Sequence, residues 1–291
     1  METAKKIILV TGGAGFVGSH LIERLVTDPT NRIISLDNYF TGKVENHIPG
    51  AEYRKGHTKD IETLIPEKPD LVFHLGEYSR VEKSFDDVAT VLDFNVVGTF
   101  HVLEFCRKNK TKIVYAGSST KFSDGGMGRD QSPYAWTKAT NTDLVRNYGE
   151  WFGIDYAITY FYNVYGGREI STGAYSTIMG IFKEQYLAGK TLSVVSPGSQ
   201  RRNFTHVDDI VNGLMIVGEK GHGDEYGIGA TESYSILEIA KMFSDNIEML
   251  PERPGNRMGS KLNIERMTQE FGWKAAKKLT DYIDEIKLQK K

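Results

Sequence analysis

Tyr134 and Lys138 are the two side chains of this sequence with the clearest chemical use. They lie four residues apart, so a helix would place both on one face. A phenol with a free pKa near ~10 is a poor base at neutral pH, but a neighbouring ammonium group stabilises the phenolate and lowers that pKa. A tyrosine positioned in this way could accept the proton of an alcohol while hydride leaves the same carbon for a nicotinamide coenzyme.

A run of hydroxyl side chains precedes this pair. Ser118, Ser119 and Thr120 follow the β-branched segment 112–116, which predicts a strand. A hydroxyl at the end of that strand could hydrogen-bond the reacting oxygen and the ketone that forms from it. Ser118 is our first choice for this catalytic hydroxyl, and the sequence leaves Ser119 and Thr120 open as alternatives.

A glycine-rich turn near the N-terminus predicts a dinucleotide site. Segment 6–10 predicts a buried strand, and Gly12, Gly15 and Gly18 follow it at the spacing of a tight turn that leads into a helix. The start of such a helix offers unpaired N–H groups to a pyrophosphate. The next predicted strand ends at Asp37, whose carboxylate could accept hydrogen bonds from ribose hydroxyls. The same carboxylate would repel a 2′-phosphate, so NAD is favoured over NADP.

The elements that must position these residues alternate between strand and helix. Such alternation predicts βαβ units, and therefore an α/β fold of the Rossmann type with a doubly wound parallel sheet. Sheets of this kind bind ligands at the carboxyl ends of their strands, where both the glycine turn and the hydroxyl run fall. The predicted strands are 6–10, 32–36, 70–75, 112–116 and 156–161, and the predicted helices are 16–26, 88–108 and 132–153.

The pattern changes after about residue 165. Segment 166–176 is rich in glycine, serine and tyrosine, and the later elements are shorter. We therefore expect an NAD-binding Rossmann domain at 1–165, which contains the Tyr-Lys pair, followed by a smaller lobe at 166–291. This C-terminal lobe should mainly bind substrate, with some of its segments returning to the Rossmann domain.

The overall composition excludes several classes of protein. Of 291 residues 40% are hydrophobic, which is typical of a globular chain, and 36 Lys and Arg against 38 Asp and Glu give no global field to gather nucleic acid or an anionic membrane. The single cysteine, Cys106, cannot form an internal disulfide, and the seven histidines show no ligand spacing, so we expect no metal. The N-terminus lacks a signal-peptide pattern. We expect a cytoplasmic protein that binds neither nucleic acid nor membrane.

With these features in hand, the sequence resembles the NAD-dependent epimerase/dehydratase family of extended short-chain dehydrogenases/reductases, and in particular its UDP-glucose 4-epimerase-like nucleotide-sugar enzymes. The resemblance covers nearly the whole chain, from about Lys5 to Tyr282. The family stretches are TGGAGFVGSHL at 11–21, LDNYFTG at 36–42, VFHLGE at 72–77, NVVGT at 95–99, YAWTK at 134–138, YNVYGGR at 162–168, PGSQRRNFTHVDD at 197–209 and ERPGNR at 252–257.

The resemblance implies a role for each matching residue. Tyr134, Lys138 and one of the three hydroxyl residues would be catalytic, and Lys138 would also hold the nicotinamide ribose. The substrate, a nucleotide-diphosphate sugar, would meet Arg80, Asn163, Arg202 and Arg253. The implied coenzyme contacts are Gly12, Gly15, Phe16, Val17, Gly18, Asp37, Asn38, Thr41, Gly42, His57, Thr58, Leu75, Gly76, Glu77, Asn95 and Lys138.

Two departures from the family pattern bear on the site. The family's usual Asp-Ile-Arg-Asp reads His57-Thr58-Lys59-Asp60, so the aspartate that normally faces adenine is missing, and His57 either donates to the ring or is solvated. Glu77 replaces a residue that is usually small. It is either a stand-in catalytic base or a carboxylate that faces the rim of the site or solvent.

Two reactions share this scaffold, and both begin with oxidation at C4 of the sugar. A 4,6-dehydratase of the family usually carries Thr-Asp-Glu at the hydroxyl strand, whereas here Thr120 is followed by Lys121 and Phe122. The missing carboxylates favour an epimerase over a dehydratase, which Glu77 keeps open as the alternative. A non-catalytic NAD-binding sensor or scaffold would be expected to lose the Tyr-Lys pair, and this chain retains it.

The resemblance also implies an assembly. The helices predicted near 88–108 and 132–153 match the family's dimer-forming pair, which implies a homodimer. Tyr175, Phe182 and Val194 are either part of the substrate pocket or ordinary core residues.

Overall fold

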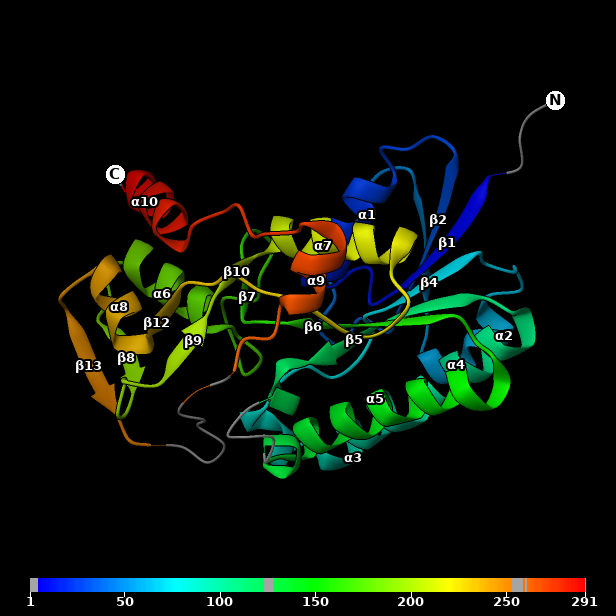
Figure 1. Cartoon of the computed structure of the whole chain (residues 1–291). Helices are drawn as coiled ribbons and strands as arrows, with labels where there is room; N and C mark the ends of the chain where they lie inside the picture. The colour runs from blue at the N-terminus through cyan, green and yellow to red at the C-terminus, as the bar shows by residue number, and fades with distance from the viewer. Residues whose placement is uncertain (1–4, 123–127, 253–258, 260, 291) are drawn as a thin grey trace.

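A seven-stranded parallel sheet lies at the centre of the structure (Figure 1). The computed structural model describes residues 5–122, 128–252, 259 and 261–290. The strands of the sheet are β1 (Lys6–Thr11), β2 (Asn31–Asp37), β3 (Ala51–Lys55), β4 (Leu71–His74), β5 (Lys112–Ser118), β6 (Tyr156–Phe161) and β11 (Gly223–Ile228). Their spatial order is β11-β6-β5-β4-β1-β2-β3, and each neighbouring pair is parallel. The α/β fold with a doubly wound parallel sheet is thus confirmed.

The two strands that the sequence did not predict are those at the edges of the sheet. β3 reads AEYRK and β11 reads GDEYGI, so neither has the β-branched run that marks a strand buried on both sides. Edge strands bury less surface and carry more charge than central strands. Their polar composition therefore conceals them from a search for apolar runs.

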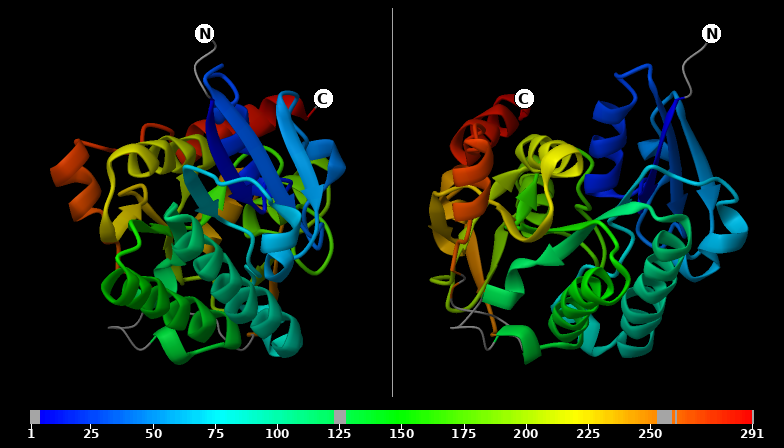
Figure 2. Two further views of the ribbon diagram at one scale, coloured as in Figure 1. Left: turned by 90° about the vertical axis from the view of Figure 1, so that its right-hand side faces the viewer. Right: turned by 45° about the vertical axis from the view of Figure 1, so that its right-hand side comes forward.

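Helices cover both faces of the sheet (Figure 2). On one face α1 (Phe16–Leu25), α7 (Val207–Lys220) and α9 (Glu265–Phe271) contribute to one apolar core together with β1, β4 and β11. On the other face α2 (Ile61–Leu64), α4 (Gly98–Asn109) and α5 (Pro133–Phe152) contribute to a second core, in which Cys106 is fully buried. α7 and β11 both follow residue 165 and return to the central sheet.

The stretch Val88–Asn109 is one continuous helix that changes its hydrogen-bond pattern. It consists of α3 (Val88–Val91), the π-helical segment η4 (Leu92–Val97) and α4. By length and composition alone this stretch could cross a membrane, but in the structure all three parts pack along α5. Single-turn π segments of this kind are often found at functional sites.

A smaller lobe lies beside the sheet and has its own apolar core, which includes Phe182 and Val194, both fully buried. The chain connects the two parts through the short parallel pair β7 (Val164–Tyr165) and β10 (Thr205–His206). The lobe's elements are α6 (Ile178–Leu187), β8 (Leu192–Val195), β9 (Arg201–Asn203), β12 (Ser233–Ser235), α8 (Ile236–Phe243), β13 (Ile247–Leu250) and α10 (Leu279–Gln289). Short helical turns complete the described chain at η1 (Val44–Asn46), η2 (Thr58–Asp60), η3 (Glu82–Phe85) and η5 (Ser119–Phe122).

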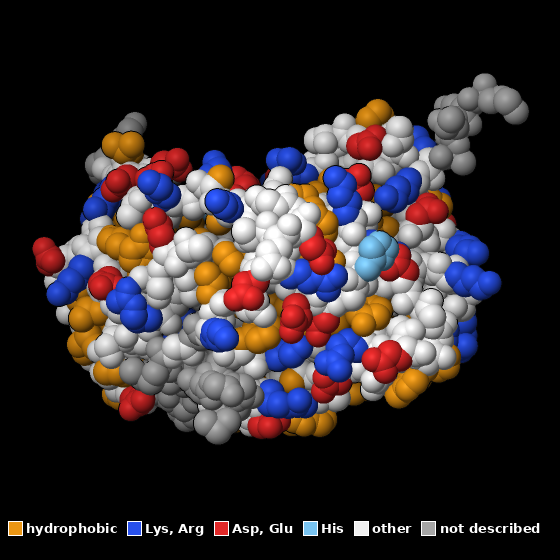
Figure 3. Space-filling model, in the orientation of Figure 1, with side chains coloured by type: hydrophobic (Ala, Val, Ile, Leu, Met, Phe, Trp, Pro, Cys, Tyr) orange, Lys and Arg blue, Asp and Glu red, His pale blue; other side chains and the backbone are white. Residues whose placement is uncertain are grey.

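The surface is charged but mixed. On the face shown in Figure 3, acidic and basic side chains are interspersed over the sheet side and the smaller lobe alike. The arrangement matches the small net charge of −2.

Candidate active site

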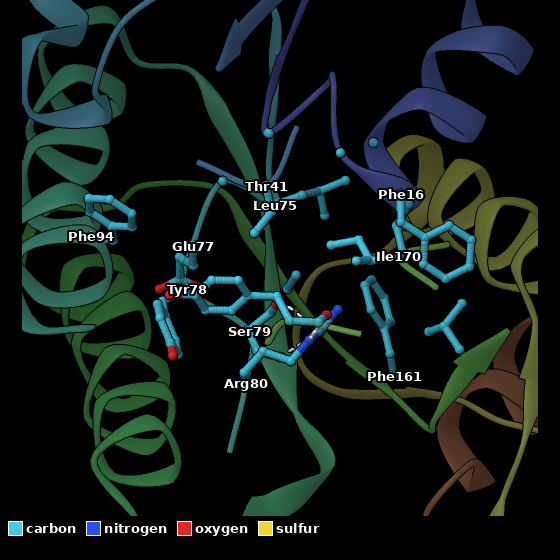
Figure 4. A pocket seen from close by; sticks show the side chains of 18 of the residues that line it. Phe16, Thr41, Leu75, Glu77, Tyr78, Ser79, Arg80, Phe94, Phe161 and Ile170 are labelled. Carbon is cyan, nitrogen blue, oxygen red and sulfur yellow. Dashed lines mark hydrogen bonds between the residues drawn. The ribbon is translucent and has the colours of Figure 1, made fainter. Parts of the chain in front are cut away.

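A cavity of about 410 Å³ opens at the carboxyl ends of the central strands, between the sheet and the smaller lobe. Its wall includes the glycine turn after β1, the ends of β2, β4 and β5, and the segment from Ile170 to Met179. Figure 4 shows Phe16 and Ile170 on one side of this space and Glu77 and Tyr78 on the other, with Arg80 pointing between them. The strand ends therefore meet at one place, as the topology predicts.

The glycine turn has the geometry of a pyrophosphate cradle. Gly12 has φ of +73°, and a Cβ there would lie 2.8 Å from Gly76 Cα, so only glycine fits between β1 and the turn after β4. α1 begins at Phe16 behind Gly15, without a side-chain cap on its first N–H groups. Phe16, Val17 and Gly18 line the cavity. The turn thus leaves backbone donors for an anion, and an NAD pyrophosphate fits this donor set.

Asp37 is held in place at the end of β2 by backbone donors. Its Oδ2 accepts from Ala14 N at 2.9 Å and its Oδ1 from Tyr39 N at 2.8 Å, and the side chain is nearly buried. Burial raises the pKa of this carboxyl, and the two N–H donors oppose the shift. Asn38, Thr41 and Gly42 also line this end of the cavity. A ribose diol would meet a carboxylate whose orientation is already fixed.

The segment after β3, where the sequence departs from the family pattern, also reaches the cavity. His57 and Thr58 line it, while His57 Nδ1 accepts from Lys59 N at 2.9 Å and Nε2 lies 3.2 Å from Asp93 Oδ2. Burial lowers the pKa of His57. The imidazole is therefore partly buried beside Asp93, rather than fully solvated, and its Nε2 makes no hydrogen bond among the described residues.

Beneath the cavity floor a chain of hydrogen bonds connects β1 to β4. Thr11 Oγ1 accepts from Leu75 N at 3.1 Å and Gly76 N at 2.9 Å, which leaves its proton for His74 Nδ1 at 2.7 Å. His74 Nε2 then donates to Thr99 Oγ1 at 2.9 Å. Complete burial lowers the pKa of His74 to about 4, so the ring is neutral. This chain fixes the turn on which Leu75 and Gly76 line the cavity.

The Tyr-Lys pair lies on the first turns of α5. Ser132 caps this helix by accepting from Ala135 N, and Pro133 occupies its first position, which matches the predicted helix start. Tyr134 and Lys138 both line the cavity. The Lys138 ammonium donates to Ala116 O and lies 4.9 Å from the ring centroid of Tyr115. The helix therefore presents phenol and ammonium to one space.

Glu77 is the unexpected partner of this lysine. Its carboxylate forms an ion pair with Lys138 Nζ, and the two side chains are only 2% and 7% exposed. The structure thus contradicts the interpretation of Glu77 as a residue at the rim or in solvent. The side chain points inward because four donors converge on its two oxygens, of which Lys138 lines the cavity and the other three lie behind the wall.

The three candidate hydroxyls lie together at the end of β5, and all line the cavity. Thr120 Oγ1 donates to Ser118 Oγ at 3.0 Å, and Thr120 N lies 3.3 Å from the same oxygen. These contacts use the acceptor side of Ser118 and leave its own proton for another group. Ser118 is thus the best placed of the three to donate to a ligand oxygen.

Two of the predicted substrate residues face the same cavity. Arg80 donates through Nε to Tyr175 O at 2.5 Å and through Nη1 to Ser79 O at 2.9 Å. No carboxylate in the described part of the chain lies within ion-pair distance of it, and burial lowers its pKa. Asn163 lines the cavity and donates to Asn203 O at 2.9 Å. Tyr175 is a lining residue too, whereas Phe182 and Val194 are core.

Two predicted residues do not line the cavity, and a third cannot be placed because it lies outside the described residues. Asn95 is fully buried in η4, where its Oδ1 accepts from Tyr78 N at 2.7 Å and its Nδ2 donates to Thr137 Oγ1 at 2.9 Å. It therefore supports the wall from behind. Arg202 lies on β9, almost buried, and donates to Arg201 O at 2.8 Å. Arg253 lies outside the described residues.

Sequence reasoning missed an aromatic group at the cavity. Phe40 packs against Phe94 with ring centroids 5.1 Å apart and against Tyr175 at 5.0 Å. Tyr78 and Tyr175 both donate to Asp87 Oδ2 at 2.8 Å, which joins the turn after β4 to the smaller lobe. The place of Phe40 within the LDNYFTG stretch was the signal that the sequence offered. Ser79, Thr177 and Met179 also line the cavity without a recognisable pattern.

Comparison with known proteins places this geometry among related folds. The model of the NAD dependent epimerase/dehydratase family matches residues 8–229. An uncharacterized UDP-glucose epimerase, YtcB of Bacillus subtilis, is 31% identical over 261 residues, which are 82% of this chain and 81% of the relative. UDP-glucuronic acid decarboxylase 6 of Arabidopsis thaliana is 28% identical, covering 94% of this chain and 85% of that protein. The UDP-glucose 4-epimerase of Thermotoga maritima, solved with UDP-glucose, superimposes with a TM-score of 0.89 and 25% identity, covering 95% and 96% of the two chains.

Proposed function

Because the chain belongs to the NAD-dependent epimerase/dehydratase family, we propose that it is a nucleotide-sugar epimerase that acts by transient oxidation at C4 of a hexose. The observation that carries this proposal is the cavity that Tyr134, Lys138 and Ser118 share with the glycine turn and Asp37. A proton acceptor and a dinucleotide cradle in one space are what reversible alcohol oxidation needs.

Each residue of the site has its own role in the proposed reaction. The glycine turn and Asp37 would hold NAD, which when bound would supply the acceptor and donor of hydride for the sugar carbon. Tyr134 accepts the proton of the C4 hydroxyl. Ser118 donates to the same sugar oxygen, so that the hydroxyl and then the 4-keto group are held at one position. Asp37 orients the adenosine ribose.

The side chains near the hydroxyl run favour epimerisation over dehydration. Elimination of water needs an acid and a base besides the tyrosine. Lys121 forms an ion pair with Asp224 at 3.1 Å and hydrogen-bonds Tyr160 at 2.9 Å, so it is engaged outside the cavity. Among the residues that the structure describes, Glu77 is the one carboxylate of the wall near the Tyr-Lys pair, and donors occupy both of its oxygens. A dehydratase remains the second candidate because Glu77 does border the cavity.

The substrate class follows from the relatives and from the cations of the site. Relatives named for UDP-glucose and UDP-glucuronic acid cover most of this chain. Arg80 is a partly buried guanidinium at the cavity with no carboxylate partner among the described residues, so an anionic group of the substrate would satisfy it. We assign Asn163 to the sugar or its phosphates, and Arg202 and Arg253 to the diphosphate.

The organisation of the molecule is part of the proposal. Residues 1–165 form the coenzyme-binding unit, and 166–291 mainly the substrate-binding lobe, in a cytoplasmic enzyme. Two such chains pair through the helical stretch Val88–Asn109 and α5 into a homodimer. The apolar side chains that these helices leave exposed are Val88, Leu92, Val97, Phe100, Trp136, Trp151 and Phe152.

A substrate panel tests the proposed function. Purified protein with NAD is incubated with UDP-, GDP- and dTDP-hexoses, and the products are examined by mass spectrometry and NMR. An epimerase yields a product of unchanged mass with altered couplings at C4. Loss of one water would identify a dehydratase, and no product from any sugar, with no coenzyme reduction, would contradict both.

A further inference from the structure

The ion pair between Glu77 and Lys138 has a chemical consequence for the catalytic pair. A lysine beside a catalytic tyrosine favours the charged form of the phenol through its positive charge. Here that charge is paired inside the protein with a carboxylate, both side chains being more than nine-tenths buried. An ion pair presents a much weaker field to a third group than a lone ammonium does, because the two charges largely cancel.

The surroundings of Glu77 are built for a negative charge. Its Oε1 accepts from Thr99 Oγ1 at 2.9 Å, Asn141 Nδ2 at 2.7 Å and Tyr115 Oη at 3.2 Å, and its Oε2 accepts from Lys138. All four neighbours donate, and a carboxylate is the side chain that only accepts. A glutamine here would turn an N–H₂ group toward at least one donor.

A chain of hydrogen bonds that begins on β1 also fixes the orientation of Glu77. The chain that begins at Thr11 runs through neutral His74 to Thr99, which donates to Glu77. Each group in this chain can donate in only one direction, because two backbone N–H groups already donate to Thr11 Oγ1 and leave its proton for His74. The glycine turn and the catalytic lysine are thus connected through one carboxylate.

We propose that Glu77 is a positioning residue of the catalytic pair, which holds the Lys138 ammonium against the end of β5 and partly neutralises it. This inference rests on the proposed function. As a consequence Tyr134 becomes a proton acceptor at a higher pH than it would beside an unpaired lysine. The carboxylate takes no proton from the substrate. It sets the pH range over which the tyrosine works.

The other charged groups around Tyr134 do not replace this effect. Tyr134 shares the cavity with Lys138 of α5 and with Glu77 and Arg80 of the turn after β4. It interacts electrostatically with Arg80 and with the phenol of Tyr115 on β5. Arg80 opposes Glu77, because it is a cation without a carboxylate partner in the described structure. Removing the charge of Glu77 should therefore leave two uncompensated cations near Tyr134.

The test is the pH dependence of kcat for four proteins. In Glu77→Gln the acidic limb should move to lower pH by on the order of one unit, as removal of a charge that borders the same cavity would produce. Glu77→Asp keeps the charge and should keep the limb close to that of the wild type. Glu104→Gln is the matched control, because it removes an equal charge from an ion pair with Arg107 on α4, and Glu104 does not line the cavity. An unmoved or raised limb in Glu77→Gln, with NAD binding intact, would overturn the proposal.

A second measurement covers the case in which Glu77→Gln fails to fold, since it leaves a buried ammonium unpaired. The double variant Glu77→Gln/Lys138→Met buries no charge. Melting temperatures of the wild type, both single variants and the double variant form a cycle. The melting temperature of the double variant should fall by less than the sum of the decreases in the two single variants. Decreases that simply add would show that no ion pair exists. This cycle needs no substrate, so it stays informative if turnover of every nucleotide-sugar fails.

Discussion

The carboxylate of Asp37 accepts a hydrogen bond from the backbone N–H of Ala14 at 2.9 Å, which joins the end of β2 to the glycine turn. The contact fixes a negative charge where the adenosine ribose of a dinucleotide would lie. A 2′-phosphate at that ribose would be repelled. We therefore expect Asp37→Asn to narrow the preference for NAD over NADP by at least ~10-fold, measured as the ratio of the two dissociation constants by calorimetry.

Asp70→Asn is the control for that prediction. Asp70 also accepts a backbone N–H, from Ile7 at 2.8 Å, but at the opposite end of β1. The ratio should stay at the wild-type value in this variant. An equal change in both variants would mean that net charge, and not the position of Asp37, determines the coenzyme preference.

Neutral His74 predicts that the protein loses stability in mild acid. The pKa of this buried ring is about 4 in the folded chain, against 6.5 for a free histidine. Between these values the unfolded chain binds a proton that the folded chain does not, so the free energy of unfolding falls as pH decreases from about 6.5 towards 4. The loss should be on the order of 2 kcal/mol by about pH 5.

Chemical denaturation of wild type and His74→Gln at neutral and acidic pH measures this effect. The variant should be less stable at neutral pH, because it disturbs the bonds to Thr11 and Thr99, but its stability should depend less on pH. His101→Gln on α4 removes a histidine outside this network and should retain the wild-type slope. Equal slopes in wild type and His74→Gln would contradict a neutral ring.

How far the sequence predicts the site depends on how local each relationship is. Tyr134 and Lys138 were found because an i, i+4 pair follows from helix geometry, and Gly12, Gly15 and Gly18 because a strand-turn-helix is one continuous segment. Glu77 lies 61 positions from Lys138 along the chain. Only the pairing of β4 with β5 and the packing of α5 bring the two together.

The same reasoning explains what the sequence concealed in the fold. The five predicted strands are all present, because strands in the interior of a parallel sheet need apolar runs. β3 and β11 lie at the edges and read as polar segments. Asn95 matched a family stretch, but whether its amide faces the cavity or the wall behind it depends on the π-helical segment η4.

The exposed apolar side chains of α4 and α5 predict that two chains associate through these helices. A single charge introduced on this surface should prevent the association. Phe100 is 44% exposed on α4. If two chains pair through these helices, Phe100→Glu would bury a charge without a partner and should convert the dimer to monomer in sedimentation or light-scattering experiments. Leu288→Glu, at an 83% exposed position on α10, should remain dimeric. A wild-type monomer at micromolar concentration would refute the proposed assembly.

Arg80 predicts a loss of substrate affinity that spares the coenzyme. Arg80→Met removes a partly buried guanidinium but keeps much of its apolar volume. Loss of one charge-assisted contact should raise KM for the nucleotide-sugar by roughly 10- to 100-fold. Calorimetry should find the dissociation constant of NAD nearly unchanged.

Lys83→Met is the comparison for Arg80, because Lys83 pairs with Asp86 at 2.8 Å in the neighbouring turn η3 and does not line the cavity. It should behave as the wild type. If Arg80→Met weakens the binding of NAD as much as the binding of the nucleotide-sugar, then Arg80 belongs to the coenzyme site.

The fate of the hydrogen on C4 tests the central claim most directly. A nucleotide-hexose labelled with deuterium at C4 is incubated with the NAD-loaded wild type and with Tyr134→Phe, and the product is examined by NMR. The account predicts a C4-inverted product that retains the deuterium, formed at least ~10²-fold more slowly by the variant that lacks the proton acceptor. Loss of the label to solvent during inversion, or near-normal turnover by Tyr134→Phe, would contradict it.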